Sequence, residues 1–355
     1  MADQPLARLY FYLTEGCNLA CRHCWLAPRF ETGPAQRPTL PVADFETAIA
    51  EARPLGLQSI KLTGGEPLMH PQISRLLEIA RREELPVTIE TNGVLCSPAL
   101  AREIASSVRP FVSVSLDGAD AETHEWVRGV PGSFEAACAG IRNLVSAGLR
   151  PQVIFTVLRR NVGQLEAVVE LAESLGAASV KFNVVQPTER GERLHEADET
   201  PGIAELIALG RDVDTRMASR TRLRLHFDHP IAFRPLSRIA SKGGGGACGI
   251  RGILGVLASG HYALCGIGES VPELVFGRVG KDALSAVWKT NAVLTSIRTG
   301  LPDRLEGICS QCLVRGRCLG SCVAQNYYRS RDLFAPYWFC EKADELGLFP
   351  AMRRI

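Results

Sequence analysis

Short apolar runs alternate with longer amphipathic segments between residues 8 and 230. The runs are rich in β-branched and aromatic residues and end in polar or glycine residues, which is typical of buried strands. They cover Leu9–Leu13, Ile60–Thr63, Pro86–Glu90, Phe111–Leu116, Gln152–Val157 and Val180–Val184. Segments with helical periodicity lie between them, near Val42–Arg53, Pro71–Glu84, Ser97–Ser107, Phe134–Ala147 and Gln164–Leu175. This order predicts an α/β fold with a parallel sheet and right-handed crossovers, curled as a partial (β/α)6 barrel of the TIM type.

The periodic pattern ends near residue 235, before the glycine-rich stretch Ser241–Gly246. Beyond it, the pattern predicts only a short strand pair near Gly252–Leu264 and a helix near Ala283–Thr299. A region with so little regular structure needs another source of order, which bound metal would supply. We therefore expect a core domain over residues 1–235, a glycine-rich bridge over 236–247, a small second domain over 248–345 and a tail over 346–355.

Composition and charge exclude several classes of protein. The 355 residues are 46% hydrophobic and 22% charged, which is typical of a globular chain with a large core. The net charge of +2 gives no electrostatic reason to expect a nucleic-acid or anionic-membrane partner. No apolar run reaches the roughly 18 residues of a membrane-spanning helix, and no secretory signal opens the chain, so we expect a cytoplasmic protein.

Twelve cysteines stand out against this ordinary composition. Disulfides rarely persist in the reducing cytoplasm, so thiols in such numbers usually bind metal or take part in chemistry. Ten of the twelve form two groups near the opposite ends of the chain. Cys96 and Cys138 stand alone, and we expect them to be small buried core residues; the alternative is a role as a hydrogen donor.

The first group, Cys17, Cys21 and Cys24, falls within eight residues directly after the first predicted strand. Three thiolates in one loop can converge on a metal cluster, and three ligands leave one iron of a [4Fe–4S] cube open to another molecule. The alternatives are a zinc site with His23 as its fourth ligand, or cysteines that are buried without a metal.

Two further motifs follow predicted strands. The sequence Thr63-Gly64-Gly65-Glu66-Pro67 combines glycines, which allow close backbone approach, with an acceptor for an ammonium group. The sequence Ser113-Val114-Ser115-Leu116-Asp117-Gly118, with Arg128 further on, offers a hydroxyl and a guanidinium for a carboxylate. Each motif alone is equally compatible with an ordinary turn.

Together the three motifs resemble the radical S-adenosylmethionine (SAM) enzymes, over about residues 8–230. The resemblance implies that Cys17, Cys21 and Cys24 hold a [4Fe–4S] cluster whose open iron binds the amino and carboxylate groups of SAM. It also implies further SAM contacts: Gly64, Gly65 and Glu66 to the amino group, Ser115 and Arg128 to the carboxylate or ribose, and His23 near the adenine. His23 departs from the family, which usually has an aromatic residue at that position.

The second group of cysteines follows the order C-x11-G-x4-C, then C-x2-C-x5-C-x3-C, then one more cysteine. A zinc ribbon is the main alternative, but seven cysteines exceed the four ligands of one tetrahedral zinc. The order resembles the SPASM extension of some radical SAM enzymes, which carries two auxiliary [4Fe–4S] clusters, so we expect three clusters in all. By position, Cys248, Cys265 and Cys322 would ligate the first auxiliary cluster, and Cys309, Cys312, Cys318 and Cys340 the second.

The first auxiliary cluster is one cysteine short of a full set, because no cysteine lies between Cys138 and Cys248. We expect its fourth position either to be open, where a substrate thiolate could bind, or to be filled by Asp, Glu, His or water.

The resemblance implies an oxidoreductase-type peptide maturase. It would cleave SAM reductively, and the 5′-deoxyadenosyl radical would abstract hydrogen from a ribosomally made precursor peptide to form a thioether, C–C or C–O cross-link. The alternatives are a sulfatase-type maturase that oxidises Cys or Ser, a peptide epimerase, and an iron–sulfur electron carrier without turnover. We assign no catalytic base.

The resemblance also implies partners. A flavodoxin- or ferredoxin-type reductant would supply electrons. Only 16 residues precede Cys17, too few for the leader-binding domain of many relatives. We therefore expect a separate leader-binding protein, or direct binding of the peptide in the barrel mouth.

Overall fold

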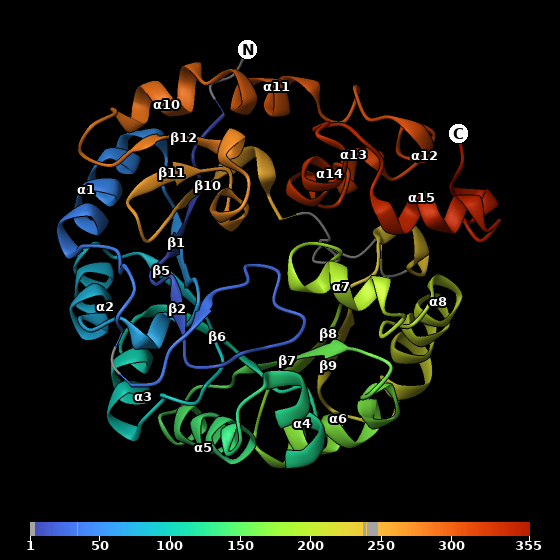
Figure 1. Cartoon of the computed structure of the whole chain (residues 1–355), viewed down its shortest axis with the longest axis horizontal. Helices are drawn as coiled ribbons and strands as arrows, with labels where there is room; N and C mark the ends of the chain where they lie inside the picture. Colours follow the sequence, from blue (N-terminus) through green and yellow to red (C-terminus); the bar gives the residue numbers. More distant parts are fainter. Residues whose placement is uncertain (1–3, 34, 237–238, 240–247) are drawn as a thin grey trace.

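A ten-stranded sheet curls around the centre of the molecule in the computed structural model, which describes residues 4–33, 35–236, 239 and 248–355 (Figure 1). In spatial order its strands are β12 (Val275–Arg278), β11 (His261–Ala263), β10 (Ile253–Val256), β1 (Arg8–Tyr12), β4 (Ser59–Thr63), β5 (Pro86–Thr91), β6 (Val108–Ser115), β7 (Gln152–Val157), β8 (Ser179–Val184) and β9 (Arg224–Phe227). From β10 to β9 all neighbours are parallel, as the alternation of strands and helices predicts. A separate pair, β2 (Gly16–Cys17) and β3 (Arg29–Phe30), lies in the loop after β1.

Helices cover the outer face of the sheet, and Figure 1 shows them as a ring around the strands. They are α1 (Val42–Ala52), α2 (Ile73–Arg82), α3 (Pro98–Ala105), α4 (Ala121–Arg128), α5 (Ser133–Ser146), α6 (Leu165–Ser174), α7 (Arg190–Glu196) and α8 (Ile203–Asp212). Alternate strand residues pack under them: Phe11 of β1 meets Phe45 of α1 with ring centroids 4.4 Å apart. The intervening residues, such as Tyr10 and Lys61, face the inside of the barrel because side chains alternate along a strand.

The six predicted strands and five predicted helices of the core are all present, with ends shifted by a few residues. Sequence reasoning missed the helices α4, α7 and α8 and the short strands β2, β3 and β9. The α4 segment is too polar to show a clear apolar stripe, but local signals define it: Asp120 accepts the Thr123 N–H at 2.8 Å, and Gly129 ends the helix in the left-handed conformation. β9 has only four residues, which is short for a periodic pattern.

The C-terminal region is joined to the barrel by its first strands. β10 pairs in parallel with β1, and β11 and β12 extend the sheet in antiparallel order. The expected glycine-rich bridge lies almost entirely outside the described residues. The single helix expected near Ala283–Thr299 is two helices, α10 (Leu284–Thr290) and α11 (Ala292–Gly300), because the Asn291 side chain caps α11 by accepting the N–H groups of Val293 and Leu294.

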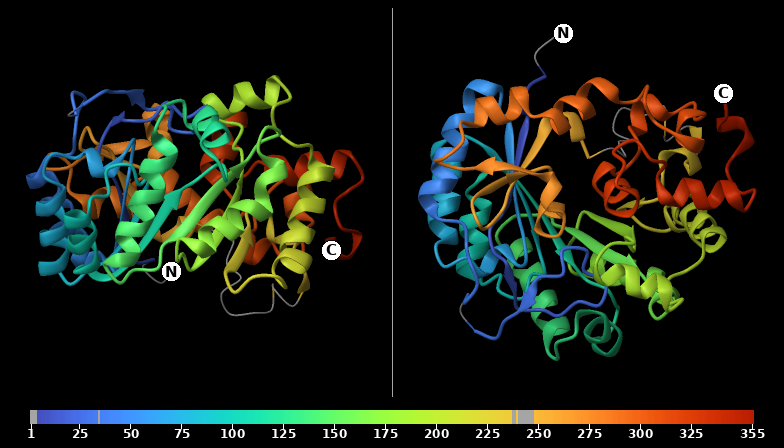
Figure 2. Two further views of the ribbon diagram at one scale, coloured as in Figure 1. Left: turned by 90° about the horizontal axis from the view of Figure 1, so that it is seen from below. Right: turned by 45° about the horizontal axis from the view of Figure 1, so that its top comes forward.

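Four short helices follow: α12 (Gly307–Ser310), α13 (Arg315–Cys318), α14 (Val323–Ser330) and α15 (Trp338–Glu345). Of these, α14 lies beside α7 and α15 beside α8 (Figures 1 and 2). Phe339 of α15 meets Phe233, which follows β9, with ring centroids 5.3 Å apart. The last helices therefore pack against the far edge of the sheet and complete the wall of the barrel. None of the described helices is both long and apolar enough to cross a membrane.

Gly140 allows α5 to lie directly against the loop after β5. A Cβ atom at this position would be 2.2 Å from the carbonyl oxygen of Gly93, so Gly140→Ala must displace the loop or the helix. We expect a destabilisation of about 1–3 kcal/mol, seen as a lower thermal-unfolding midpoint. Gly163→Ala is the matched control, because no described atom lies within 4 Å of its added Cβ. Equal midpoints for the two variants would contradict this packing.

Candidate functional site

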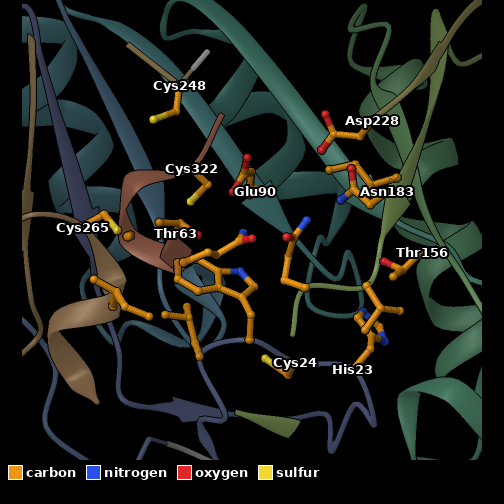
Figure 3. Close-up of a pocket in the computed structure, with 18 of the residues that line it drawn as sticks. His23, Cys24, Thr63, Glu90, Thr156, Asn183, Asp228, Cys248, Cys265 and Cys322 are labelled. Atoms are coloured by element: carbon orange, nitrogen blue, oxygen red, sulfur yellow. The ribbon is translucent and has the colours of Figure 1, made fainter. Parts of the chain in front are cut away.

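A cavity of about 560 Å³ occupies the inside of the barrel (Figure 3). Its wall includes seven cysteines that come from both ends of the chain: Cys17, Cys21, Cys24, Cys248, Cys265, Cys318 and Cys322. The fold therefore brings together two motifs that more than 200 residues separate in sequence.

The loop that carries the first cysteines is fixed from several directions. Cys17 Sγ accepts the Leu19 N–H at 3.4 Å, and the neighbouring Asn18 side chain accepts a hydrogen bond from Asn92 Nδ2 at 2.7 Å. Arg190 of α7 donates to the carbonyl oxygens of Cys21 and Pro28, at 3.1 and 2.7 Å. The three thiols are thus presented together to the cavity.

Gly64 and Gly65 lie against this loop. A Cβ atom on Gly65 would be 1.9 Å from the Gly16 carbonyl oxygen, and Gly64 has a φ of +127°, which an L side chain rarely adopts. The Gly65 and Glu66 N–H groups donate to the carbonyls of Thr14 and Gly16. The paired glycines therefore allow their own backbone to pack closely against the loop before Cys17. Both glycines also line the cavity.

Glu66 is buried at the edge of the cavity with its carboxylate already oriented. Oε1 accepts from Thr91 Oγ1 at 2.6 Å and from the Leu68 N–H at 3.0 Å, and Oε2 accepts from the Asn92 N–H at 2.8 Å. Burial raises the pKa of Glu66, and these hydrogen bonds oppose the rise. A carboxylate has about four acceptor sites, so one remains for an ammonium group.

Arg128, at the end of α4, forms a buried ion pair with Asp117: Nη2 lies 2.7 Å from Oδ2, and Asp117 is fully buried. Burial alone would lower the pKa of Arg128, but Asp117 and the thiol of Cys21 raise it above its usual value. His23 Nε2 lies 3.8 Å from the same carboxylate. Burial lowers the pKa of His23 to about 4 against the pull of Asp117, with Arg128 contributing to the drop, so the imidazole is neutral at pH 7.

Two buried nitrogen atoms of this cluster, His23 Nδ1 and Arg128 Nε, have no hydrogen-bond partner among the described residues. The Ser115 side chain, at the end of β6, also lines the cavity. Because unpaired buried polar groups cost free energy, these positions fit a ligand that offers acceptors. SAM offers a carboxylate, ribose hydroxyls and adenine nitrogens, so its chemistry matches the predicted contact residues.

The C-terminal cysteines fall into two sets. Cys248, Cys265 and Cys322 lie near one another on the cavity wall (Figure 3). Burial raises the pKa of Cys322, and the thiols of the other two raise it further. The second set comprises Cys309, Cys312, Cys318 and Cys340; burial raises the pKa of Cys340 far above normal, and its three neighbours add to the rise.

Buried thiols that repel one another as thiolates fit a cationic metal cluster, which stabilises the deprotonated form. Among the described residues, no three His, Cys, Asp or Glu side chains converge closely enough to hold a single metal ion. A [4Fe–4S] cube binds each thiolate through a different iron, so its ligands need not converge on one point. The two sets match the division predicted from sequence, and their role as cluster ligands stays a prediction.

Cys96 and Cys138 lie in the hydrophobic core, 3% and 1% exposed, as predicted.

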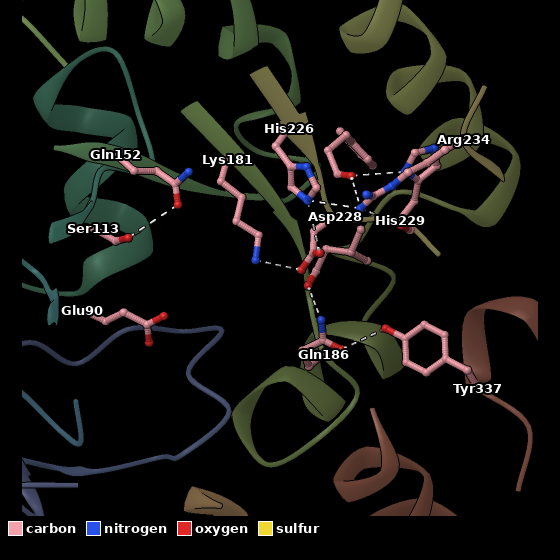
Figure 4. Close-up of polar contacts among 12 residues, drawn as sticks. Glu90, Ser113, Gln152, Lys181, Gln186, His226, Asp228, His229, Arg234 and Tyr337 are labelled. Atoms are coloured by element: carbon pink, nitrogen blue, oxygen red, sulfur yellow. Dashed lines mark hydrogen bonds and ion pairs between the residues drawn. The ribbon is translucent and has the colours of Figure 1, made fainter. Parts of the chain in front are cut away.

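Sequence reasoning missed the polar side chains that line the inside of the barrel (Figures 3 and 4). Lys61 of β4 lies 2.6 Å from Glu90 of β5, and Lys181 of β8 lies 3.2 Å from Asp228, which follows β9. Bulky aliphatic residues normally fill such a barrel. The sequence did contain a signal for them, namely polar residues at alternate positions of the predicted strands. Alternate positions of a strand point to the same face of the sheet, here the inner face of the barrel.

Comparison with known proteins agrees with this geometry. Residues 11–172 match the family model described as the Radical SAM superfamily. The chain is 30% identical to the AdoMet-dependent heme synthase of Methanosarcina barkeri, over 92% of this chain and 94% of that protein. It is also 30% identical to the mycofactocin maturase MftC of Mycobacterium ulcerans, over 94% and 87% of the two chains. Among solved structures, Streptococcus suis SuiB bound to S-adenosylmethionine is similar in fold, with a TM-score of 0.73, 18% identity, and coverage of 96% of this chain and 78% of that one.

The Asp117–Arg128 pair gives a stability prediction. Asp117→Asn leaves a buried guanidinium without its counter-charge, and we expect a loss of about 3–5 kcal/mol, measured by chemical unfolding. The matched control is Asp228→Asn, which breaks the Lys181 pair; about a third of both side chains is exposed there, so the loss should stay within about 1 kcal/mol. Similar losses in the two variants would show that burial of the Asp117 pair is not what makes it important.

Proposed function

We propose a function for this chain from the premise that it belongs to the radical SAM superfamily and is an enzyme with a SPASM-type C-terminal region. The proposed reaction removes hydrogen from a ribosomally made precursor peptide and leaves an intramolecular thioether, C–C or C–O cross-link. The observation that carries the proposal is the single cavity lined by both groups of cysteines. A substrate in this cavity would contact the SAM site and the first auxiliary set at the same time.

The residues present fit SAM and its cluster. Cys17, Cys21 and Cys24 would hold the [4Fe–4S] cluster, and Gly64, Gly65, Glu66, Ser115, Arg128 and His23 would contact SAM. When bound, the two together supply a radical that removes a hydrogen atom from an unactivated C–H bond. The chain itself orients the amino group through Glu66, supplies donors from Arg128, and encloses the site so that water does not compete.

We further propose two auxiliary [4Fe–4S] clusters, so that the chain carries three. Cys309, Cys312, Cys318 and Cys340 would complete one of them. Cys248, Cys265 and Cys322 would hold the other, with a fourth position either open to a substrate thiolate or filled by Asp, Glu, His or water.

The charges of the cavity wall favour a peptide over a heme-type substrate. Among the described residues of the wall, the four Lys and Arg side chains all have partners: Lys61 and Lys181 pair with carboxylates, Arg128 pairs with Asp117, and Arg190 donates to backbone carbonyls. Heme carries propionate carboxylates, which would need cationic partners when buried. Glu90 is the partner of Lys61, but 39% of its side chain is exposed, so its remaining acceptor sites can receive hydrogen bonds from peptide donors.

A heme-forming activity is the second candidate, because the Methanosarcina barkeri relative carries that name and matches nearly the whole chain. Sulfatase-type oxidation and epimerisation of a peptide are narrower alternatives to the cross-link.

Partners and location complete the proposal. A flavodoxin- or ferredoxin-type reductant would deliver electrons, and a separate leader-binding protein would present the peptide unless the peptide binds the barrel mouth directly. The buried thiols suit a reducing compartment, the cytoplasm. We also propose the functional division expected from sequence: residues 1–235 for SAM, and 248–345 for the auxiliary clusters.

Co-expression with each short open reading frame encoded beside the gene tests the reaction. We expect a peptide product that has lost two hydrogens and whose fragmentation shows a ring; Cys17→Ala, the matched control, should leave the mass unchanged. An aldehyde would support sulfatase-type oxidation, and an unchanged mass with inverted stereochemistry would support epimerisation. Conversion of a carboxylated tetrapyrrole, with every peptide unmodified, would contradict the peptide proposal.

Cluster content tests the ligand assignments. The reconstituted protein should contain about twelve iron and twelve sulfide per chain. Cys322→Ser should weaken one auxiliary cluster signal in electron paramagnetic resonance (EPR) spectra, and Cys318→Ser should weaken the other, although only four positions separate these cysteines. About four iron together with zinc, or the loss of one and the same signal in both variants, would defeat the assignment.

A further inference from the structure

Arg128 makes a contact that SAM binding does not require. Its Nη1 atom donates to the Sγ atom of Cys21 at 3.5 Å, while Nη2 holds Asp117 at 2.7 Å. Arg128 and Cys21 are 6% and 7% exposed, so the contact is shielded from solvent. Among the described residues, no other charged side chain donates a hydrogen bond to a cysteine sulfur.

The position of this guanidinium is fixed by its surroundings. Asp117 Oδ1 accepts the Thr156 N–H at 2.7 Å, and the Asp117 carbonyl accepts from Asn161 Nδ2 at 3.0 Å. On the other side, the Arg128 carbonyl accepts the Ala20 N–H at 3.0 Å, so the end of α4 is bonded to the cysteine loop itself. The backbone of Arg128 therefore cannot leave the cysteine loop without breaking this hydrogen bond, and its side chain cannot turn away without breaking the ion pair with Asp117.

A cation held against a cluster thiolate changes the energy of reduction. One-electron reduction of a [4Fe–4S] cluster adds one negative charge and neither forms nor breaks a bond. Net charge and hydrogen bonds to the sulfurs set the potential of such clusters, and both act strongly where water is excluded. The nearby groups do not replace Arg128: His23 Nε2 lies 3.8 Å from the Asp117 carboxylate, and Arg190 donates to the Cys21 carbonyl rather than to its sulfur.

We propose that Arg128, held by Asp117, is a positioning residue that raises the reduction potential of the cluster at Cys17, Cys21 and Cys24 through its hydrogen bond to the Cys21 thiolate. The proposal rests on the proposed function for the presence of that cluster. It adds to the predicted SAM contact, because Arg128 Nε has no partner among the described residues and stays available to SAM.

A potentiometric titration of the reconstituted full chain, without SAM or peptide, tests the proposal. The cluster is followed by the EPR signal that changes when SAM is added to a parallel sample. In Arg128→Met the midpoint should move to a more negative potential, so that the ratio of reduced to oxidised cluster at the wild-type midpoint falls by about tenfold or more. Arg128→Gln keeps an N–H donor without the charge and should shift less.

Arg160→Met is the matched control, because Arg160 is a half-exposed arginine that pairs with Glu122 of α4, the helix that also carries Arg128. This variant should keep the wild-type midpoint. An unchanged midpoint in both Arg128 variants, with the signal intact, would overturn the proposal. Loss of the cluster from both variants would also overturn it, because Arg128 would then act in assembly. A wild-type chain whose EPR signal does not change with SAM would instead refute the proposed function. A peptide that stays unmodified in the co-expression experiment would not affect the result of the titration.

Discussion

The parallel pairing of β10 with β1 is the constraint on which the whole site depends. β1 leads directly into the loop of Cys17, Cys21 and Cys24, and the β10–β11 hairpin leads to Cys265. Because the two strands are hydrogen-bonded in register, from Arg8 opposite Ile253 to Phe11 opposite Val256, Cys265 is brought to the same cavity as the first group of cysteines. The first strands of the C-terminal region are therefore part of the same sheet as the barrel strands.

Charge burial sets the second constraint. Several ionisable groups of the cavity wall form complementary pairs, such as Lys61 with Glu90 and Lys181 with Asp228. Such pairs limit the cost of placing charge inside a barrel, and they leave acceptor oxygens facing the space where a substrate would lie. The buried Arg128–Asp117 pair is the extreme case, because it is almost inaccessible to solvent and touches a predicted cluster ligand.

Much of this arrangement could be predicted from the sequence, since strand and helix periodicity are local signals and the cysteine spacing is specific. The parts that could not be predicted are those that arise from distant contacts. Asp117 looked like an ordinary turn residue, and only the fold shows that it holds Arg128. The paired glycines indicated close approach of a ligand, whereas Gly65 first of all accommodates the backbone at Gly16. The pairing of Lys61 with Glu90 could not be predicted, because periodicity shows on which face of the sheet a side chain lies but not which side chain it contacts there.

The central claim is that both groups of cysteines serve one reaction in one cavity. Anomalous diffraction at the iron edge, from crystals of the anaerobically reconstituted chain with SAM, tests it most directly. The result predicted here is three iron clusters, with those at Cys17 and at Cys265 on opposite walls of the same SAM-containing cavity. A zinc ion at the C-terminal cysteines, or an iron cluster there that is walled off from SAM, would contradict it.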